Sequence, residues 1–190
     1  MIRRAAAGGI AIVLVLAACS SNEPPPPPPP PTQTTAPPTG PDTAAENAAR
    51  RAAAEEAARL AEAERARLRS VLEQVVLFDY DESRIRSDAE TVLQQKVPIL
   101  RANPGVRLRI GGHADERGSV EYNLALGLRR ANSVRDYLVN FGIDASRVTT
   151  ETFGEDRPVD RGTTEAAYQR NRRAEFTITA GGENLVAPGG

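Results

Sequence analysis

Two oppositely charged side chains in the middle of the chain could form a ligand site. Asp115 lies in an acidic loop between Gly112 and Gly118. Arg130 follows in a segment whose apolar and small residues recur at helical spacing, and it falls on that core-facing stripe together with Asn123. A guanidinium on such a stripe stays protonated, so it needs an anion and several acceptors nearby. The alternative to a ligand site is an internal Asp115–Arg130 ion pair that only fixes the loop.

The helices and strands that position these residues can be predicted from the spacing of apolar residues and from capping and turn residues. Residues 75–78 are an apolar run typical of a buried strand, and Ser87 or Asp88 can cap a helix that contains Pro98 and runs to about Arg101. Strands are expected over 106–110, 148–153 and 174–179, with Gly111-Gly112 ending the first of them. Helices are expected from Ser119 to Phe141-Gly142 and over 165–170. The order predicts an α+β sandwich, a β-α-β-α-β-α-β domain with helices on one face of a small sheet.

Composition argues against a nucleic-acid partner. The formal net charge is −1, and acidic residues are interleaved with the arginines, so no basic face stands out. Four Tyr, four Phe and no Trp leave few platforms for stacking bases or sugars.

The first residues indicate an exported protein. Residues 1–18 combine Arg3 and Arg4 with an apolar stretch too short to span a bilayer stably, and Leu16-Ala17-Ala18-Cys19 closes it. This ending resembles a lipobox, which implies cleavage before Cys19 and acylation of that cysteine with S-diacylglycerol and an N-acyl chain. Cys19 is the only cysteine, so no disulfide framework is available. Ser20 in the next position favours the outer membrane, facing the periplasm, as the destination.

Two spacer-like segments separate this start from the folded part. Residues 19–42 contain the proline run Pro24–Pro31, which favours a stiff polyproline II segment. Residues 43–70 are rich in Ala, Glu and Arg, and Glu46/Arg50 and Glu55/Arg59 are spaced as helix ion pairs, so an exposed helix is predicted. A coiled coil is the alternative, although the large apolar residues that it needs are missing. We expect one domain over 71–180 and a disordered tail over 181–190.

Several motifs of that domain are similar to those of one known family. They are Phe78-Asp79-Tyr80-Asp81, the loop Gly112-His113-Ala114-Asp115-Glu116-Arg117-Gly118, Glu121-Tyr122-Asn123, Leu126-Gly127, Arg129-Arg130-Ala131-Asn132, and the run from Ala166 to Ala174. In this order and spacing they resemble the OmpA-like C-terminal domain family, and more narrowly its peptidoglycan-associated lipoproteins.

The resemblance implies non-covalent binding of peptidoglycan through the diaminopimelate of its stem peptide. It assigns the ligand ammonium to Asp115 and the ligand carboxylate to Arg130, with Asn123 in reach on the same helix face. Asp79, Tyr80 and Leu126 are further candidates at the border of the pocket. The implied partners are diaminopimelate-type peptidoglycan, the outer membrane through the lipid, and the Tol proteins, including TolB.

Other functions fit the sequence less well. His113, Asp115 and Glu116 are potential metal donors, but adjacent loop residues rarely converge on one ion, so we predict no metal site and no cofactor beyond the lipid. Asp115 and Glu116 cannot flank a sugar from two sides, and no activated nucleophile is visible, so we predict no enzyme. A generic OmpA-like structural lipoprotein with other partners is the alternative function.

Overall fold

The computed structural model describes residues 41–189, so the signal segment, Cys19 with its expected lipid, and the proline run lie outside the described residues. The elements in chain order are α1 (Pro41–Glu73), β1 (Val76–Leu77), α2 (Ser87–Ala102), β2 (Arg107–His113), α3 (Val120–Asn140), the 3-10 turn η1 (Ala145–Arg147), β3 (Val148–Gly154), α4 (Glu165–Asn171) and β4 (Arg173–Ala180). Within this part of the chain, no helix has the length and apolar character needed to cross a membrane.

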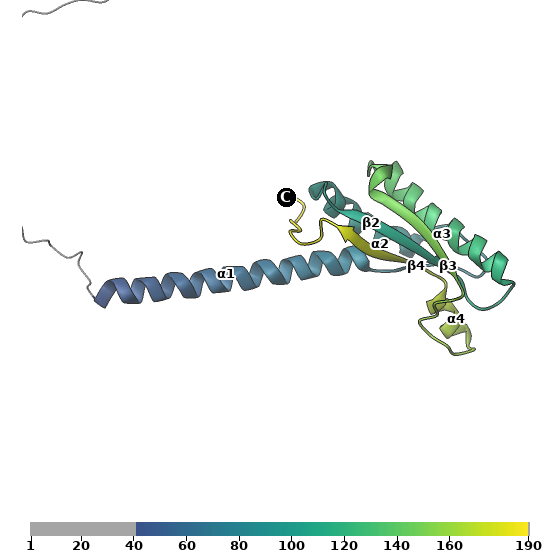
Figure 1. The fold of residues 1–190 in the computed structure, drawn as a ribbon, viewed down its shortest axis with the longest axis horizontal. Coiled ribbons are helices and arrows are strands. Elements are labelled where there is room, and N and C mark those ends of the chain that lie inside the picture. Colours follow the sequence, from purple (N-terminus) through teal and green to yellow (C-terminus); the bar gives the residue numbers. More distant parts are fainter. Residues whose placement is uncertain (1–40, 190) are drawn as a thin grey trace, which may run out of the picture. The chain divides into compact units, whose positions relative to one another are not determined.

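The four strands form one sheet in the order β1-β4-β2-β3, which confirms the predicted α+β class (Figure 1). β2 and β3 are parallel, whereas β4 is antiparallel to both β1 and β2. One core joins Leu93 of α2 and Val134 of α3 to Leu108 and Ile110 of β2 and Phe176 of β4. The helices α2 and α3 therefore bury their apolar stripes against the same face of the sheet.

The helix α1 matches the predicted spacer in type but continues into the domain. Its side chains from residue 43 to 63 are exposed, and the predicted Glu46–Arg50 ion pair is present. Arg59 pairs with Glu56, one turn away, rather than with Glu55. Leu68 and Leu72, by contrast, are buried in the domain core. The last turns of α1, up to Glu73, thus belong to the core, although the sequence predicts that the spacer ends at residue 70.

A buried lysine fastens the end of α1 to α2. Lys96 is fully buried, and its Nζ donates to the carbonyls of Val71, Leu72 and Gln74 at 2.7, 2.9 and 2.7 Å. The last carbonyls of a helix have no partner within the helix and attract positive charge. Burial lowers the pKa of Lys96 to about 7, and Glu73 acts in the opposite direction. Lys96 thus serves as a cap supplied by another helix.

The predicted helix ends are partly confirmed. Ser119 caps α3, because its side chain accepts a hydrogen bond from the Tyr122 backbone N–H, and Gly142 after that helix has a φ of 82°. At α2, however, neither Ser87 nor Asp88 is the cap. Arg86 occupies the cap position in extended conformation without a side-chain cap, and Ser87 is the first helical residue.

The tail, for which the sequence predicts disorder, contacts the domain at residues 182, 185 and 186. Leu185 is buried in the core, and the backbone N–H and C=O of Val186 both bond to the Asn103 side chain. The Gly182 carbonyl accepts a hydrogen bond from Arg69 of α1. These partners lie far away in the sequence, so the glycine-rich composition of the tail gives no sign of them.

The close packing of α3 on β2 depends on two glycines. The sequence predicted that Gly111-Gly112 would end the strand, but β2 continues to His113 because β4 pairs with both glycines. A Cβ on Gly112 would lie 1.8 Å from the Gly127 carbonyl oxygen, and one on Gly127 would lie 2.5 Å from Thr152 Oγ1. Only glycine at both positions lets the backbones of helix and strand approach this closely.

His113 lies beyond these glycines, with its side chain stacked on Phe153 at a centroid distance of 5.0 Å. It is 1% exposed, neither ring nitrogen has a hydrogen-bond partner, and Glu175 Oε2 is 3.6 Å from Nε2. Burial, together with Arg173 and Arg157, lowers the pKa of His113 to about 4 despite the opposing effect of Glu175. The imidazole is therefore neutral at pH 7.

Replacing Gly112 with alanine should destabilise the domain. The new methyl group would overlap the backbone of α3, so we expect a loss of about 3 kcal/mol or more in the free energy of unfolding, measured by urea titration. Gly105→Ala is the matched control, because a Cβ there meets nothing within 4 Å. Equal stability of the two variants would contradict the packing role of Gly112.

His113 should make the domain less stable in mild acid. Between pH 6.5 and 4 the unfolded chain holds a proton on His113 that the folded chain does not, so stability is lost as the pH falls through this window. The shift corresponds to a loss of about 3 kcal/mol at most. Urea titrations from pH 7 to pH 4 should show a smaller decrease for His113→Gln than for the wild type. Parallel pH profiles would exclude this role.

Candidate ligand-binding site

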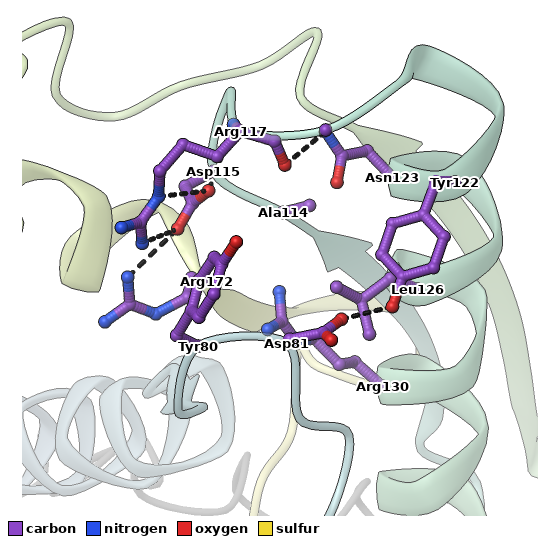
Figure 2. Close-up of a pocket in the computed structure, with 11 residues that line it drawn as sticks. Tyr80, Asp81, Ala114, Asp115, Arg117, Tyr122, Asn123, Leu126, Arg130 and Arg172 are labelled. Carbon is purple, nitrogen blue, oxygen red and sulfur yellow. Dashed lines mark hydrogen bonds and ion pairs between the residues drawn. The ribbon is translucent and has the colours of Figure 1, made fainter.

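A small pocket of about 90 Å³ lies where the loop after β1, the loop between β2 and α3, and the first half of α3 meet (Figure 2). It is lined by Tyr80, Asp81, Ala114, Asp115, Arg117, Gly118, Tyr122, Asn123, Leu126, Arg130 and Arg172. Figure 2 shows Asp115 beside Arg117 and Arg172, and Tyr122, Leu126 and Arg130 contributed by α3. Strongly charged groups of both signs therefore face one confined space.

Asp115 is 3% exposed and is held by arginines. Its Oδ1 accepts from the backbone N–H and the Nε of Arg117, both at 3.1 Å. Its Oδ2 accepts from Arg117 Nη2 at 2.6 Å and from Arg172 Nη1 at 2.9 Å. Burial alone would raise the pKa of Asp115, but the hydrogen bonds from Arg117 and Arg172 outweigh burial and hold the pKa below its usual range. The carboxylate is ionised at neutral pH.

Arg130 is fully buried, and its bonds go to backbone oxygens rather than to Asp115. Its Nε, Nη1 and Nη2 donate to the carbonyls of Glu82, His113 and Asp79 at 2.8, 2.8 and 2.9 Å. The internal Asp115–Arg130 ion pair that the sequence left open is thus replaced by pairs of Asp115 with Arg117 and Arg172. Burial, and secondarily Arg172, lowers the pKa of Arg130 to about 10, so it stays charged at pH 7.

A guanidinium has five N–H groups, and these three bonds leave two for other acceptors. Because Arg130 lines the pocket, a carboxylate that enters there is the natural acceptor. Arg130 can therefore fix the pocket wall and bind an anion at the same time.

The other predicted residues fall in two groups. Tyr80 and Leu126 line the pocket, as does Asn123, whose Nδ2 donates to the Arg117 carbonyl and to Glu155. Asp79 does not line it: its carboxylate accepts from Arg86 Nη1 at 2.8 Å, and only its backbone carbonyl reaches Arg130. The structure thus brings five of the six predicted residues to one site and leaves the Asp79 side chain outside.

Sequence reasoning missed the roles of Arg117 and Tyr122 in this pocket. Arg117 lies two residues after Asp115, and that proximity was the available signal. Tyr122 donates from its hydroxyl to Asp81, which has a left-handed φ of 55° that turns the loop after β1 toward α3. Arg172 ties the start of the last strand to neighbouring segments, because its Nε donates to the Phe78 carbonyl and its Nη2 to Glu165.

Within residues 41–189, no three potential metal donors of the His, Cys, Asp or Glu type come together. The His113 side chain stacks on Phe153, whereas Asp115 lines the pocket with Arg117 and Arg172.

The chain is similar to proteins of known family. Residues 77–172 match the model of the OmpA family. The peptidoglycan-associated lipoprotein of Mesorhizobium japonicum is 43% identical over 107 residues, which cover 56% of this chain and 64% of the relative. That of Haemophilus influenzae is 41% identical over 99 residues, covering 52% and 65%. The matches thus span less than two thirds of these relatives.

Solved structures agree with this relationship. The crystal structure of the peptidoglycan-associated lipoprotein from Burkholderia pseudomallei superposes with a TM-score of 0.54 at 36% identity, covering 56% of this chain and 90% of that one. A C-terminal domain of MotB from Helicobacter pylori shares the fold, with a TM-score of 0.52 at 17% identity. With a matched region that contains the whole pocket from Tyr80 to Arg172, the chain belongs to the OmpA family.

Proposed function

We propose that the chain is an outer-membrane lipoprotein that tethers the membrane to the cell wall by binding diaminopimelate in the stem peptide of peptidoglycan. The observation that carries the proposal is one pocket lined by both the buried Asp115 carboxylate and the buried Arg130 guanidinium. The names of the relatives, which are peptidoglycan-associated lipoproteins, support peptidoglycan as the polymer that is bound.

The ligand chemistry fits the charges of the pocket. The diaminopimelate side chain ends in an ammonium and a carboxylate on one carbon, so its site needs an acceptor and a cationic donor close together. Asp115 supplies the acceptor, Arg130 the donor, and Asn123 supports the loop between them through the Arg117 carbonyl. Lysine in the same place of a stem peptide lacks the carboxylate, so the N–H groups of Arg130 would lose a partner.

The proposed activity is binding without catalysis. A glycosidase needs one carboxylic acid that keeps its proton and a second carboxylate across the sugar. Asp115 is ionised, buried and saturated with arginine hydrogen bonds, so it has no proton to give and little basicity. Asp115 can therefore hold a cationic group of a ligand but is unsuited to act as a general acid or base.

The proposal extends to the anchor and the partners. Acylation of Cys19 would hold the chain in the outer membrane, and α1 with the preceding segment would carry the domain toward the wall. The motifs around Asp115 and Arg130, which resemble those of peptidoglycan-associated lipoproteins, support a partnership with the Tol proteins.

Removal of the Asp115 charge should weaken wall binding selectively. The full-length protein, purified in mild detergent, is sedimented with diaminopimelate-type sacculi at a series of concentrations. We expect Asp115→Asn to lower the affinity about tenfold to a hundredfold, because a charge-assisted hydrogen bond to the ligand ammonium is lost. Asp79→Asn is the matched control, since it removes a nearby carboxylate that lies outside the pocket. The wild type should bind lysine-type sacculi only weakly.

The outcomes separate the site from the function. If Asp115→Asn sediments like the wild type, the wall is bound elsewhere; if the wild type stays in solution with both walls, the tether function is wrong. Arg130 is unsuited to this first test, because its loss would also free three backbone carbonyls. Thermal unfolding of Asp115→Asn checks that the variant remains folded.

The Tol partnership predicts a direct complex with TolB. Purified full-length protein and TolB should associate in a calorimetric titration, and a soluble muropeptide that contains diaminopimelate should weaken the association if the partner contacts loops around the pocket. Absence of heat and of co-migration on a sizing column would favour a generic OmpA-like lipoprotein with other partners.

A further inference from the structure

All acceptor positions of Asp115 are in use. A carboxylate offers about four lone-pair positions, and Asp115 receives four hydrogen bonds, two on each oxygen. A ligand ammonium also needs these oxygens. It can therefore reach Asp115 only if one of the present donors withdraws.

The side chain of Arg117 is the donor that can leave. The backbone N–H of Arg117 is fixed by the loop and cannot withdraw. Arg172 is also held in place, because its side chain is 3% exposed and donates to Phe78 and Glu165 as well. The Arg117 side chain is 33% exposed and reaches Asp115 from the pocket rim. Its other supports lie at the surface: Glu165 at 3.2 Å, and the rings of Tyr80 and Tyr168, whose centroids lie 4.1 and 4.5 Å from its guanidinium carbon.

The charges around Asp115 favour replacement of the Arg117 guanidinium by the ligand ammonium over addition of the ammonium beside it. Asp115 already faces Arg117 and Arg172, and Arg130 lines the same pocket. A further ammonium beside three guanidinium groups would be repelled, whereas an ammonium that replaces the Arg117 guanidinium keeps the local charge unchanged.

We infer that Arg117 is an internal competitor of the ligand: its guanidinium occupies the position on Asp115 that the ammonium of a diaminopimelate residue takes, and binding exchanges the two cations. This inference rests on the proposed function, because it concerns the same site. Arg117 would then affect the affinity because its guanidinium must leave Asp115 before the ligand binds. Asp115, in contrast, would affect the affinity by contacting the ligand.

The test is calorimetric titration of the full-length protein with a muropeptide tripeptide that ends in diaminopimelate. Arg117→Ala should bind about fivefold more tightly than the wild type, because no internal ion pair has to be broken first. Arg129→Ala is the matched control: it removes an exposed arginine near the rim, over the Tyr122 ring, without touching Asp115, and it should bind like the wild type. Arg117→Lys, which keeps a cation at this position, should not gain affinity.

A second readout follows Arg117 in the wild type and does not depend on any variant folding. The Nε–H signal of Arg117, assigned by NMR, should lose its hydrogen-bonded shift and its protection from exchange when the muropeptide is added. An unchanged signal at saturation would overturn the exchange.

The two levels of the proposal fail in different ways. If the wild type binds and Arg117→Ala binds equally or less tightly, Arg117 is a ligand contact or a bystander, and the tether function stands without the exchange. If neither protein binds, both proposals are wrong. If only Arg117→Ala binds, Arg117 blocks the ligand instead of exchanging with it, and the exchange is wrong.

Discussion

The pocket depends on one buried guanidinium that holds three backbone segments together. Arg130, rooted in α3, donates to the carbonyls of Asp79 and Glu82 in the loop after β1 and to that of His113 at the end of β2. Burying a charge is costly unless its donors are satisfied, and here the carbonyl dipoles provide that compensation. Because β1 has only two residues, the loop after it has little other regular structure to fix it. The same side chain thus builds the site and presents charge to it.

The approach of α3 that makes these bonds feasible is set elsewhere. Gly112 and Gly127 let helix and strand come into backbone contact, and Arg130 follows Gly127 by less than one turn on the same helix. The chain therefore combines a steric condition, the absence of two side chains, with an electrostatic one, the presence of a guanidinium. Neither condition would position the loops without the other.

Local sequence patterns predicted much of the fold because helices and strands follow from periodicity and caps. The stripe from Leu126 to Leu138, the Ser119 cap and the alternation around Leu108 all correspond to observed elements. The failures involve partners distant in the sequence. Nothing near Leu185 indicates that it packs into the core, and nothing near Lys96 indicates that it caps α1.

In the site, too, local features were predictable from the sequence and distant contacts were not. Asp115 and Arg130 were recognisable from their types and spacing, and the OmpA-like motifs added Asn123, Tyr80 and Leu126. The distant partner of Asp115 was not recognisable, since Arg172 lies 57 residues away and reaches Asp115 only through the placement of β4. Asp79 was misplaced because residue type alone does not reveal which way a loop side chain turns, and here Arg86 attracts it away from the pocket.

The attachment of α1 also determines how the domain bears mechanical load. The chain enters the fold through α1, so a pull on its N-terminal side reaches the core through Leu68, Leu72 and the carbonyls held by Lys96. Tension would be shared between apolar contacts and three hydrogen bonds that must break together, rather than peeling the two-residue strand β1 from the sheet edge. The contacts between α1 and the domain core thus carry this load in place of the edge strand of the sheet.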